Sequence, residues 1–389
     1  MTFDPGTDTC PTNAGLDSAP AARSDVDADL ARCMADVFER RGSDLHLAVG
    51  RAPMIRIDGH LVEQSEHAEL DLGSLERMLR SLLDEAGWQA FLDRRQADFS
   101  VTLPEVGRFR VNAYHQLGSI AVAMRAISAV IPSTAEVGLP SDVEQVSRFP
   151  YGLVLFVGPT GSGKSTTQAA LIGSINATRQ CHILTIEDPV EYVHGIGTAL
   201  MSQREVGSDV HSFADGLRAA LREDPDIVLL GEMRDEESIA IALTLAETGH
   251  LVFATLHTND AVQAVDRIVD SYPSDRRSQI QTQMAGALQA VVSQRLVPRI
   301  GGGRTAAFEV IIANDAIRNL IREGRTRQMR NVVSTGRADG MRTLEQSLST
   351  LVADGVVSHR DAVNVSQYPN EIHNPSVAEA SPAAPLQRR

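Results

Sequence analysis

The chain has 389 residues and a formal net charge of −14. This length predicts two domains plus tails. The acidic balance and an aromatic content of only 4% argue against nucleic acid as the main partner, because such a partner requires a basic surface. Three cysteines without a C-x-x-C pair indicate neither a zinc knuckle nor a disulfide framework. Without a signal peptide or a membrane-length apolar run, we expect a cytoplasmic protein whose membrane contact runs only through protein partners.

Residues 1–27 are rich in Asp, Ala and Ser and predict a disordered tail. Residues 28–127 then predict a small α+β domain. Its first part carries a helical pattern over 30–41 and a second apolar helix face that starts at Leu72. Alternating hydrophobicity predicts its strands at 44–49, 54–57, 60–62, 98–103, 109–115 and 120–127.

Residues 128–149 carry Pro132, Gly138 and Pro140, and predict the interdomain linker. Strand and helix patterns then alternate through 150–365, which predicts a parallel sheet covered by helices on both faces. We expect strands at 153–157, 182–187, 227–231 and 251–256, helices at 164–176, 212–223 and 236–247, a β-segment at 306–312 and helices from 315 onward. A Pro- and Ala-rich stretch, 366–389, predicts a second disordered tail.

One segment matches the phosphate-binding pattern G-x-x-x-x-G-K-[ST]. It contains Gly158, Pro159, Thr160, Gly161, Ser162, Gly163, Lys164, Ser165 and Thr166. Its glycines allow consecutive backbone N–H groups to surround phosphate oxygens. Lys164 would place a charge at the β- and γ-phosphates, and the Ser165 hydroxyl would ligate Mg²⁺. An apolar strand before the segment and a helix after it favour a site for ATP and Mg²⁺.

Acidic residues follow two of the predicted strands, at the sheet edge where such folds bind ligands. Glu187, Asp188 and Glu191 follow the strand at 182–187, where their mutual repulsion favours a cation or proton chemistry; a solvated acidic loop is the alternative. Glu232 follows four apolar residues, as in a Walker B strand, and would reach Mg²⁺.

Two further kinds of residue suit phosphate chemistry. His257 ends the strand at 251–256, where a neutral imidazole could bind the γ-phosphate or simply cap the strand. Arg110 and Arg125 lie on strands of the first domain. They are either exposed strand residues or the positive charges that phosphoryl transfer requires.

Together these segments resemble the secretion ATPases of type IV pili and type II secretion. The segments that carry the resemblance are 158–166 (Walker A), 185–192 (the Asp box), 221–235 (Walker B), 248–258 (the His box) and 316–323. The last segment resembles a motif of the pilus-retraction branch. The extension branch commonly has a four-cysteine zinc site, which this sequence lacks.

The resemblance implies a PAS-like α+β domain joined to a RecA-like P-loop domain, assembled as a homohexamer that acts on an inner-membrane pilus platform protein. It implies that Glu191 is the general base, that Glu232 helps to hold Mg²⁺ and that His257 couples the γ-phosphate to the ring. Arg110 and Arg125 match arginines that approach the phosphates when the two domains close.

Four functions stay open at this point. The first is a pilus-retraction motor. The second is an extension or type II secretion motor with the same chemistry. The third is an ATP-binding regulator or scaffold with little hydrolysis, and the fourth, a nucleic-acid translocase, is the least favoured because of the acidic charge.

Overall fold

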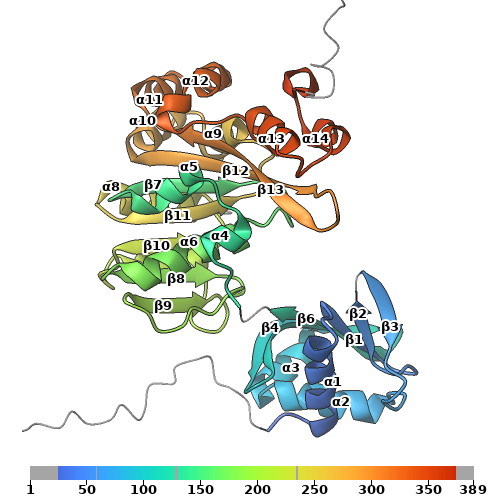
Figure 1. Cartoon of the computed structure of the whole chain (residues 1–389). Coiled ribbons are helices and arrows are strands. Elements are labelled where there is room, and N and C mark those ends of the chain that lie inside the picture. The colour runs from blue at the N-terminus through green and yellow to red at the C-terminus, as the bar shows by residue number, and fades with distance from the viewer. Residues whose placement is uncertain (1–24, 58, 128–129, 234, 374–389) are drawn as a thin grey trace, which may run out of the picture. The chain divides into compact units, whose positions relative to one another are not determined.

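The computed structural model describes residues 25–57, 59–127, 130–233 and 235–373. They form two compact units that meet in sequence between residues 129 and 130, and each unit is described by itself (Figure 1).

The first unit is an antiparallel sheet packed against helices. The sheet order is β3-β2-β1-β6-β5-β4. Its core contains Met34, Leu45, Leu79, Phe91 and Phe109, which come from helices and strands alike. The elements are α1 (Ala28–Glu39), β1 (Asp44–Ala48), β2 (Met54–Ile57), β3 (His60–Glu63), α2 (Leu72–Leu82), α3 (Glu85–Arg94), β4 (Gln96–Leu103), β5 (Gly107–Gln116) and β6 (Ser119–Ile127). All six expected strands are present, whereas α3 was not expected.

The second unit contains a seven-stranded sheet in the order β13-β12-β7-β11-β10-β8-β9. All neighbours are parallel except β12 and β13, which pair antiparallel. The strands are β7 (Gly152–Val157), β8 (His182–Glu187), β9 (Leu200–Glu205), β10 (Ile227–Leu230), β11 (Leu251–Leu256), β12 (Leu288–Pro298) and β13 (Arg304–Ile312). The expected parallel sheet is therefore present, with one antiparallel edge strand.

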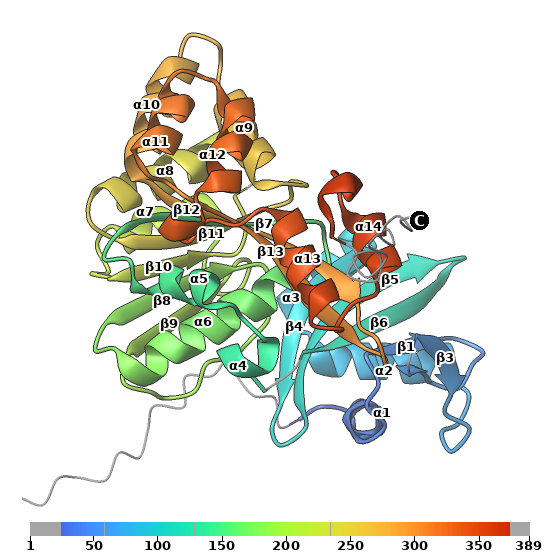
Figure 2. The same ribbon diagram turned by 45° about the horizontal axis from the view of Figure 1, so that its top comes forward.

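Helices cover both faces of this sheet. The longer ones are α6 (Lys164–Thr178), α7 (Phe213–Ala220), α8 (Glu236–Glu247), α9 (Ala261–Asp270), α10 (Arg277–Ala287), α11 (Asp315–Arg322) and α13 (Leu344–Ala353). The shorter ones are α4 (Thr134–Val137), α5 (Ser141–Glu144), η1 (Gln145–Arg148), η2 (Thr326–Gln328), α12 (Met329–Thr335), η3 (Arg337–Asp339), α14 (His359–Val365) and η4 (Pro369–Glu371). Figure 2 shows α13 and α14 beside β13.

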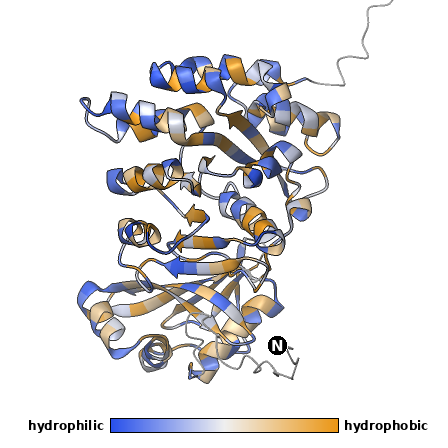
Figure 3. Ribbon diagram, turned by 90° about the vertical axis from the view of Figure 1, so that its left-hand side faces the viewer, coloured by the Kyte–Doolittle hydropathy of each residue, from blue (hydrophilic) through white to orange (hydrophobic). Residues whose placement is uncertain are grey.

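Alternate residues of each central strand enter different cores. Leu153, Leu155 and Val157 of β7 belong to the core beneath α7–α11, whereas Val154 and Phe156 belong to the core beneath α6. All six residues of β7 are buried, as in a strand covered on both faces. In Figure 3 the strands are mainly hydrophobic, and hydrophilic segments lie on the surrounding helices. No helix in the described ranges has both the length and the apolar composition that a membrane crossing requires.

Most of the predicted linker is structured. Residues 134–148 form α4, α5 and η1, and they belong to the second unit. Leu139, Val143 and Val146 are buried in the core beneath α6. The composition of the segment, which proline and glycine interrupt, predicts a linker instead. Asp142 also forms an ion pair with Arg342 at 2.9 Å.

The described parts of both predicted tails are ordered and make contacts. Asp27 accepts backbone hydrogen bonds at the start of α1, and residues 1–24 lie outside the described range. At the other end, Ile372 is buried and Arg330 lies over the ring of Tyr368, 3.6 Å from its centre. Residues 366–373 therefore pack on the second unit, and residues 374–389 lie outside the described range.

Candidate nucleotide site

The phosphate-binding segment lies between β7 and α6. Gly158, Gly161 and Gly163 have φ angles of +144°, +76° and +86°. Such angles are unfavourable for residues with a Cβ atom. Lys164 then begins α6, so the backbone N–H groups of the first helical turn face the loop. This is the arrangement that binds phosphate at a helix N-terminus.

The floor of the loop is formed by β12. A Cβ atom on Gly158 would lie 2.4 Å from the backbone oxygen of Gln294, and one on Gly163 would lie 2.9 Å from the Gln294 side-chain nitrogen. Gln294 is buried, and its side-chain oxygen accepts a hydrogen bond from the Thr167 hydroxyl at 2.9 Å. The loop therefore keeps its shape through contacts with a distant strand.

Lys164 is held inside the loop. Its Nζ donates to the backbone oxygens of Gly158 at 2.8 Å and Pro159 at 3.1 Å, and only 5% of the residue is exposed. Burial lowers the pKa of the Lys164 amine, whereas the nearby carboxylates of Glu232 and Glu191 raise it. The acidic groups thus stabilise the charge that phosphate recognition needs.

His257 lies between Lys164 and Glu232. Its Nδ1 is 3.5 Å from Lys164 Nζ, and its Nε2 is 3.5 Å from Glu232 Oε1. The three residues follow three neighbouring strands, β7, β11 and β10, in the sheet order. The structure therefore brings together predicted residues that are far apart in the sequence, at the carboxyl edge where such sheets bind ligands.

Glu191 lies in the loop that follows β8, and its side chain is exposed. Its neighbour Tyr192 contacts the phosphate-binding segment, because the Tyr192 hydroxyl is 2.9 Å from Thr166 Oγ1. The loop that carries Glu191 therefore contacts the phosphate-binding segment.

Glu187 ends β8 close to this loop. Burial raises the pKa of its carboxyl to about 7, while the N–H of Glu191, which donates to Glu187 Oε2 at 3.4 Å, acts in the opposite direction. Burial, with a smaller contribution from the Glu191 charge, therefore favours a partly protonated Glu187 carboxyl near neutral pH.

Arg110 and Arg125 belong to the first unit. They lie directly opposite each other on β5 and β6. Arg110 forms an ion pair with Asp98 of β4 at 2.8 Å, and Arg125 forms one with Asp44 of β1 at 2.9 Å. These acids offset the repulsion between two opposed cations. The approach of the arginines to a nucleotide stays a prediction.

Comparison with known proteins identifies the family. The pattern of the type II/IV secretion system proteins matches residues 21–339, well over half of the chain. The chain belongs to this family.

The chain is 44% identical over 341 residues to the Pseudomonas aeruginosa protein named "Type IV pilus retractation ATPase PilT", covering 88% of this chain and 99% of that one. It is 45% identical over 307 residues to a "Twitching motility protein" of Neisseria gonorrhoeae, covering 79% and 82% of the two chains. A crystal structure described as the pilus retraction motor PilT with bound ADP is 44% identical, with a TM-score of 0.81 over 86% of this chain and 96% of that one. The predicted family and α/β fold class are confirmed.

The residues present at the loop fit a nucleotide. The loop has the glycine conformations described above, and the buried Ser162 hydroxyl has no hydrogen-bond partner among the residues that the structure describes. Within the described residues, no three His, Cys, Asp or Glu side chains are arranged to hold a metal ion. Mg²⁺ usually binds through one or two protein oxygens together with substrate phosphates. Ser165 and Glu232 supply oxygens of that kind.

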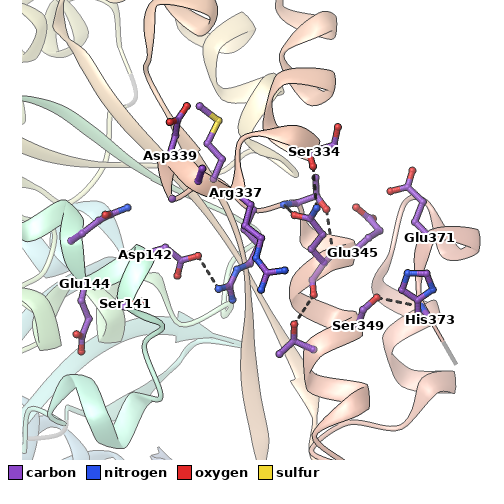
Figure 4. Close-up of a pocket in the computed structure, with 18 of the residues that line it drawn as sticks. Ser141, Asp142, Glu144, Ser334, Arg337, Asp339, Glu345, Ser349, Glu371 and His373 are labelled. Atoms are coloured by element: carbon purple, nitrogen blue, oxygen red, sulfur yellow. Dashed lines mark hydrogen bonds and ion pairs between the residues drawn. The ribbon is translucent and has the colours of Figure 1, made fainter. Parts of the chain in front are cut away.

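A cavity of about 830 Å³ lies elsewhere in the second unit, between the α5–η1 segment and α13 (Figure 4). Its walls carry Asp142, Arg148, Arg337 and Glu345, so charges of both signs face it. None of the predicted site residues is among its described lining residues. This cavity is therefore separate from the candidate nucleotide site.

Sequence reasoning missed the residues that support the site, namely Gln294, Thr167 and Tyr192. Gln294 contacts a residue 127 positions away, and Tyr192 contacts one 26 positions away. No local spacing signals such partners. Only the pairing of β12 with β7 reveals the role of Gln294.

Proposed function

We propose that this family member is a Mg²⁺-dependent ATPase that powers type IV pilus retraction, and hence twitching motility. The observation that carries this proposal is the placement of His257 between Lys164 and Glu232 at the phosphate-binding loop. The relatives named above as a retraction ATPase and a twitching motility protein support the choice among motors.

Each site residue has a role in this proposal. The loop 158–166 binds the phosphates through backbone N–H groups, and Lys164 neutralises their charge. Ser165 and Glu232 hold Mg²⁺, which when bound offsets the negative charge of the phosphates. Glu191 accepts a proton from the attacking water, and His257 responds to the γ-phosphate. Arg110 and Arg125 exchange their acidic partners for phosphate oxygens.

The mechanical step follows from the two units. Nucleotide draws the arginines of the first unit toward the loop of the second, and product release allows the units to separate. We propose that this cycle runs in a homohexameric ring in the cytoplasm, at the inner face of the cytoplasmic membrane. There the ring would act on a pilus platform protein and have no direct lipid contact.

Phosphate release by the purified protein with ATP and Mg²⁺ tests the chemistry. Lys164→Ala should abolish turnover, and the charge-preserving Lys164→Arg should fail as well because a guanidinium does not fit the buried position of Nζ. Unchanged thermal unfolding of both variants is the control for folding. Full activity of Lys164→Ala would overturn the proposal, and an inactive wild type that still binds ATP would favour the regulator or scaffold.

Piliation separates the two kinds of motor. A deletion strain with surplus pili indicates retraction, whereas bald cells indicate extension. Helix α11, which carries the motif that resembles the retraction branch, supports the first outcome. Complementation by wild type but not by Glu191→Ala would tie the phenotype to hydrolysis.

A further inference from the structure

The loop that carries Glu191 has little regular structure of its own. Residues 188–199, between β8 and β9, contain neither helix nor strand. Backbone N–H and C=O groups in such a segment need partners when they are shielded from water. Asn176 of α6 provides partners for residues 195–199, and two side chains of β9 provide them for residues 190–194.

Gln203 and Glu205 make the contacts at alternate loop positions. The N–H of Val190 donates to Glu205 Oε2 at 3.0 Å. Gln203 Nε2 donates to the carbonyl oxygen of Tyr192 at 2.8 Å, and Gln203 Oε1 accepts from the N–H of His194 at 2.8 Å. These two side chains therefore satisfy backbone groups of residues 190–194 that a neighbouring strand would satisfy in a sheet.

The position of Gln203 and Glu205 in the sheet explains why they can do this. They are two residues apart on β9, so their side chains point to the same face. In the parallel register they lie opposite Thr185 and Glu187 of β8, the strand from which the loop emerges. Glu205 is 6% exposed, so its carboxylate is fixed rather than free in solvent.

The hydrogen bonds to β9 fall on either side of Glu191. The backbone groups of Val190 and Tyr192 both hydrogen-bond to β9 side chains, and the Tyr192 hydroxyl contacts Thr166 of the phosphate-binding loop. The Glu191 N–H faces Glu187. The backbone is therefore held before and after Glu191 while its side chain stays exposed.

We propose that Gln203 and Glu205 are positioning residues for the general base Glu191. This inference rests on the proposed function, in which Glu191 activates the attacking water. A general base must reach its proton at hydrogen-bond distance, and misplacement by about 1 Å can reduce a rate about 100-fold. Gln203 and Glu205 touch neither nucleotide nor water in this role; they fix the backbone that presents the carboxylate.

Gln203→Met keeps the size of the side chain and removes its hydrogen bonds to Tyr192 and His194. We expect kcat to fall by about 10-fold or more, with the Kd for ADP within about 2-fold of wild type because Gln203 has no hydrogen bond to the phosphate-binding loop itself. Ser202→Ala is the matched control. It removes a hydrogen bond from the same strand, between Ser202 Oγ and His182 Nε2, and should leave kcat unchanged.

Glu205 allows a rescue experiment. Glu205→Gln keeps a side-chain oxygen for the Val190 N–H and should retain most of the activity, whereas Glu205→Ala should lose it. Equal losses in both variants would contradict a positioning role through this hydrogen bond.

A double-mutant cycle separates positioning from general stability. If Gln203 acts through Glu191, Gln203→Met should add no further loss of kcat to Glu191→Gln. Additive losses, or an unchanged kcat in Gln203→Met, would overturn the inference. If Glu191→Gln itself keeps full activity, the proposed role of Glu191 fails instead, so the two failures are distinguishable.

Discussion

Gly158 illustrates how a single backbone position determines whether the site can form. Its φ of +144° is unfavourable for residues with a side chain, and the backbone oxygen of Gln294 occupies the space where a Cβ atom would lie. Gly161 has a positive φ too, but its missing Cβ meets no atom within 4 Å. Gly161 is therefore required only by its backbone conformation, whereas Gly158 is required by its conformation and by its contact with β12.

We expect Gly158→Ala to weaken nucleotide binding far more than Gly161→Ala does. Gly161→Ala adds only backbone strain, about 1 kcal/mol. Gly158→Ala adds a clash with β12 that the loop can relieve only by moving. Titration of both variants with ADP measures the difference. Equal affinities would show that β12 does not constrain the loop.

At the residue scale, the sequence predicted the parts of the site that a short motif defines. The prediction of Lys164 and Ser165 rests on a fixed spacing within nine residues, which phosphate binding requires. The prediction of Glu232 and His257 rests on the position of each after an apolar strand. Gln294 and Gln203 were missed because they contribute through the pairing of strands, which local spacing does not encode.

At the element scale, α5 and η1 show how a segment with linker composition becomes part of a folded unit. Val143 and Val146 are fully buried, and Asp142 forms an ion pair with Arg342 at 2.9 Å in the lining of the cavity described above. The side chain of Asp142 is 12% exposed and that of Arg342 is 30% exposed. An ion pair so placed stabilises more than one in open solvent.

Asp142→Ala should therefore destabilise the second unit by about 1–2 kcal/mol and increase amide hydrogen exchange in residues 134–148. The control is Arg276→Ala, which breaks an exposed ion pair with Glu236 and should change neither quantity. Unaltered exchange in Asp142→Ala would show that the buried apolar residues alone hold the segment.

The strands differ in how far the sequence could predict them. β8 and β11 were predicted with their observed bounds because apolar runs between turns mark buried parallel strands. β9 was missed because it lies at the sheet edge and four of its six residues, Leu-Met-Ser-Gln-Arg-Glu, are polar. β12 was missed because it follows α10 directly, without a residue that marks a turn.

At the scale of the whole molecule, one buried acid couples folding to pH. Glu309 of β13 is 9% exposed, and its Oε2 accepts a hydrogen bond from the Ala261 N–H at the start of α9. Burial, with smaller contributions from Asp260 and Glu345, raises the pKa of Glu309 from 4.5 to about 7. The folded protein therefore retains a proton that the unfolded chain releases between these values.

Wild type should lose stability relative to Glu309→Gln as pH rises from about 4.5 to about 7, because the unfolded state binds fewer protons over that window. The variant keeps an oxygen for the Ala261 N–H. At pH 8 the free energy of unfolding of Glu309→Gln should exceed that of wild type by up to roughly 3 kcal/mol. At pH 5 the two free energies should be nearly equal. Thermal unfolding at both values measures this, and a difference independent of pH would contradict the assignment.

Lys164 has a consequence beyond catalysis, because it is the one lysine among the 36 lysines and arginines of the chain. Every other long-chain cation is an arginine, which carries no ε-amino group. An amine-directed reagent can therefore reach only one ε-amino group, that of Lys164. Because Lys164 is 5% exposed and lies inside the phosphate-binding loop, we expect its labelling to be slow and to become slower still when nucleotide binds.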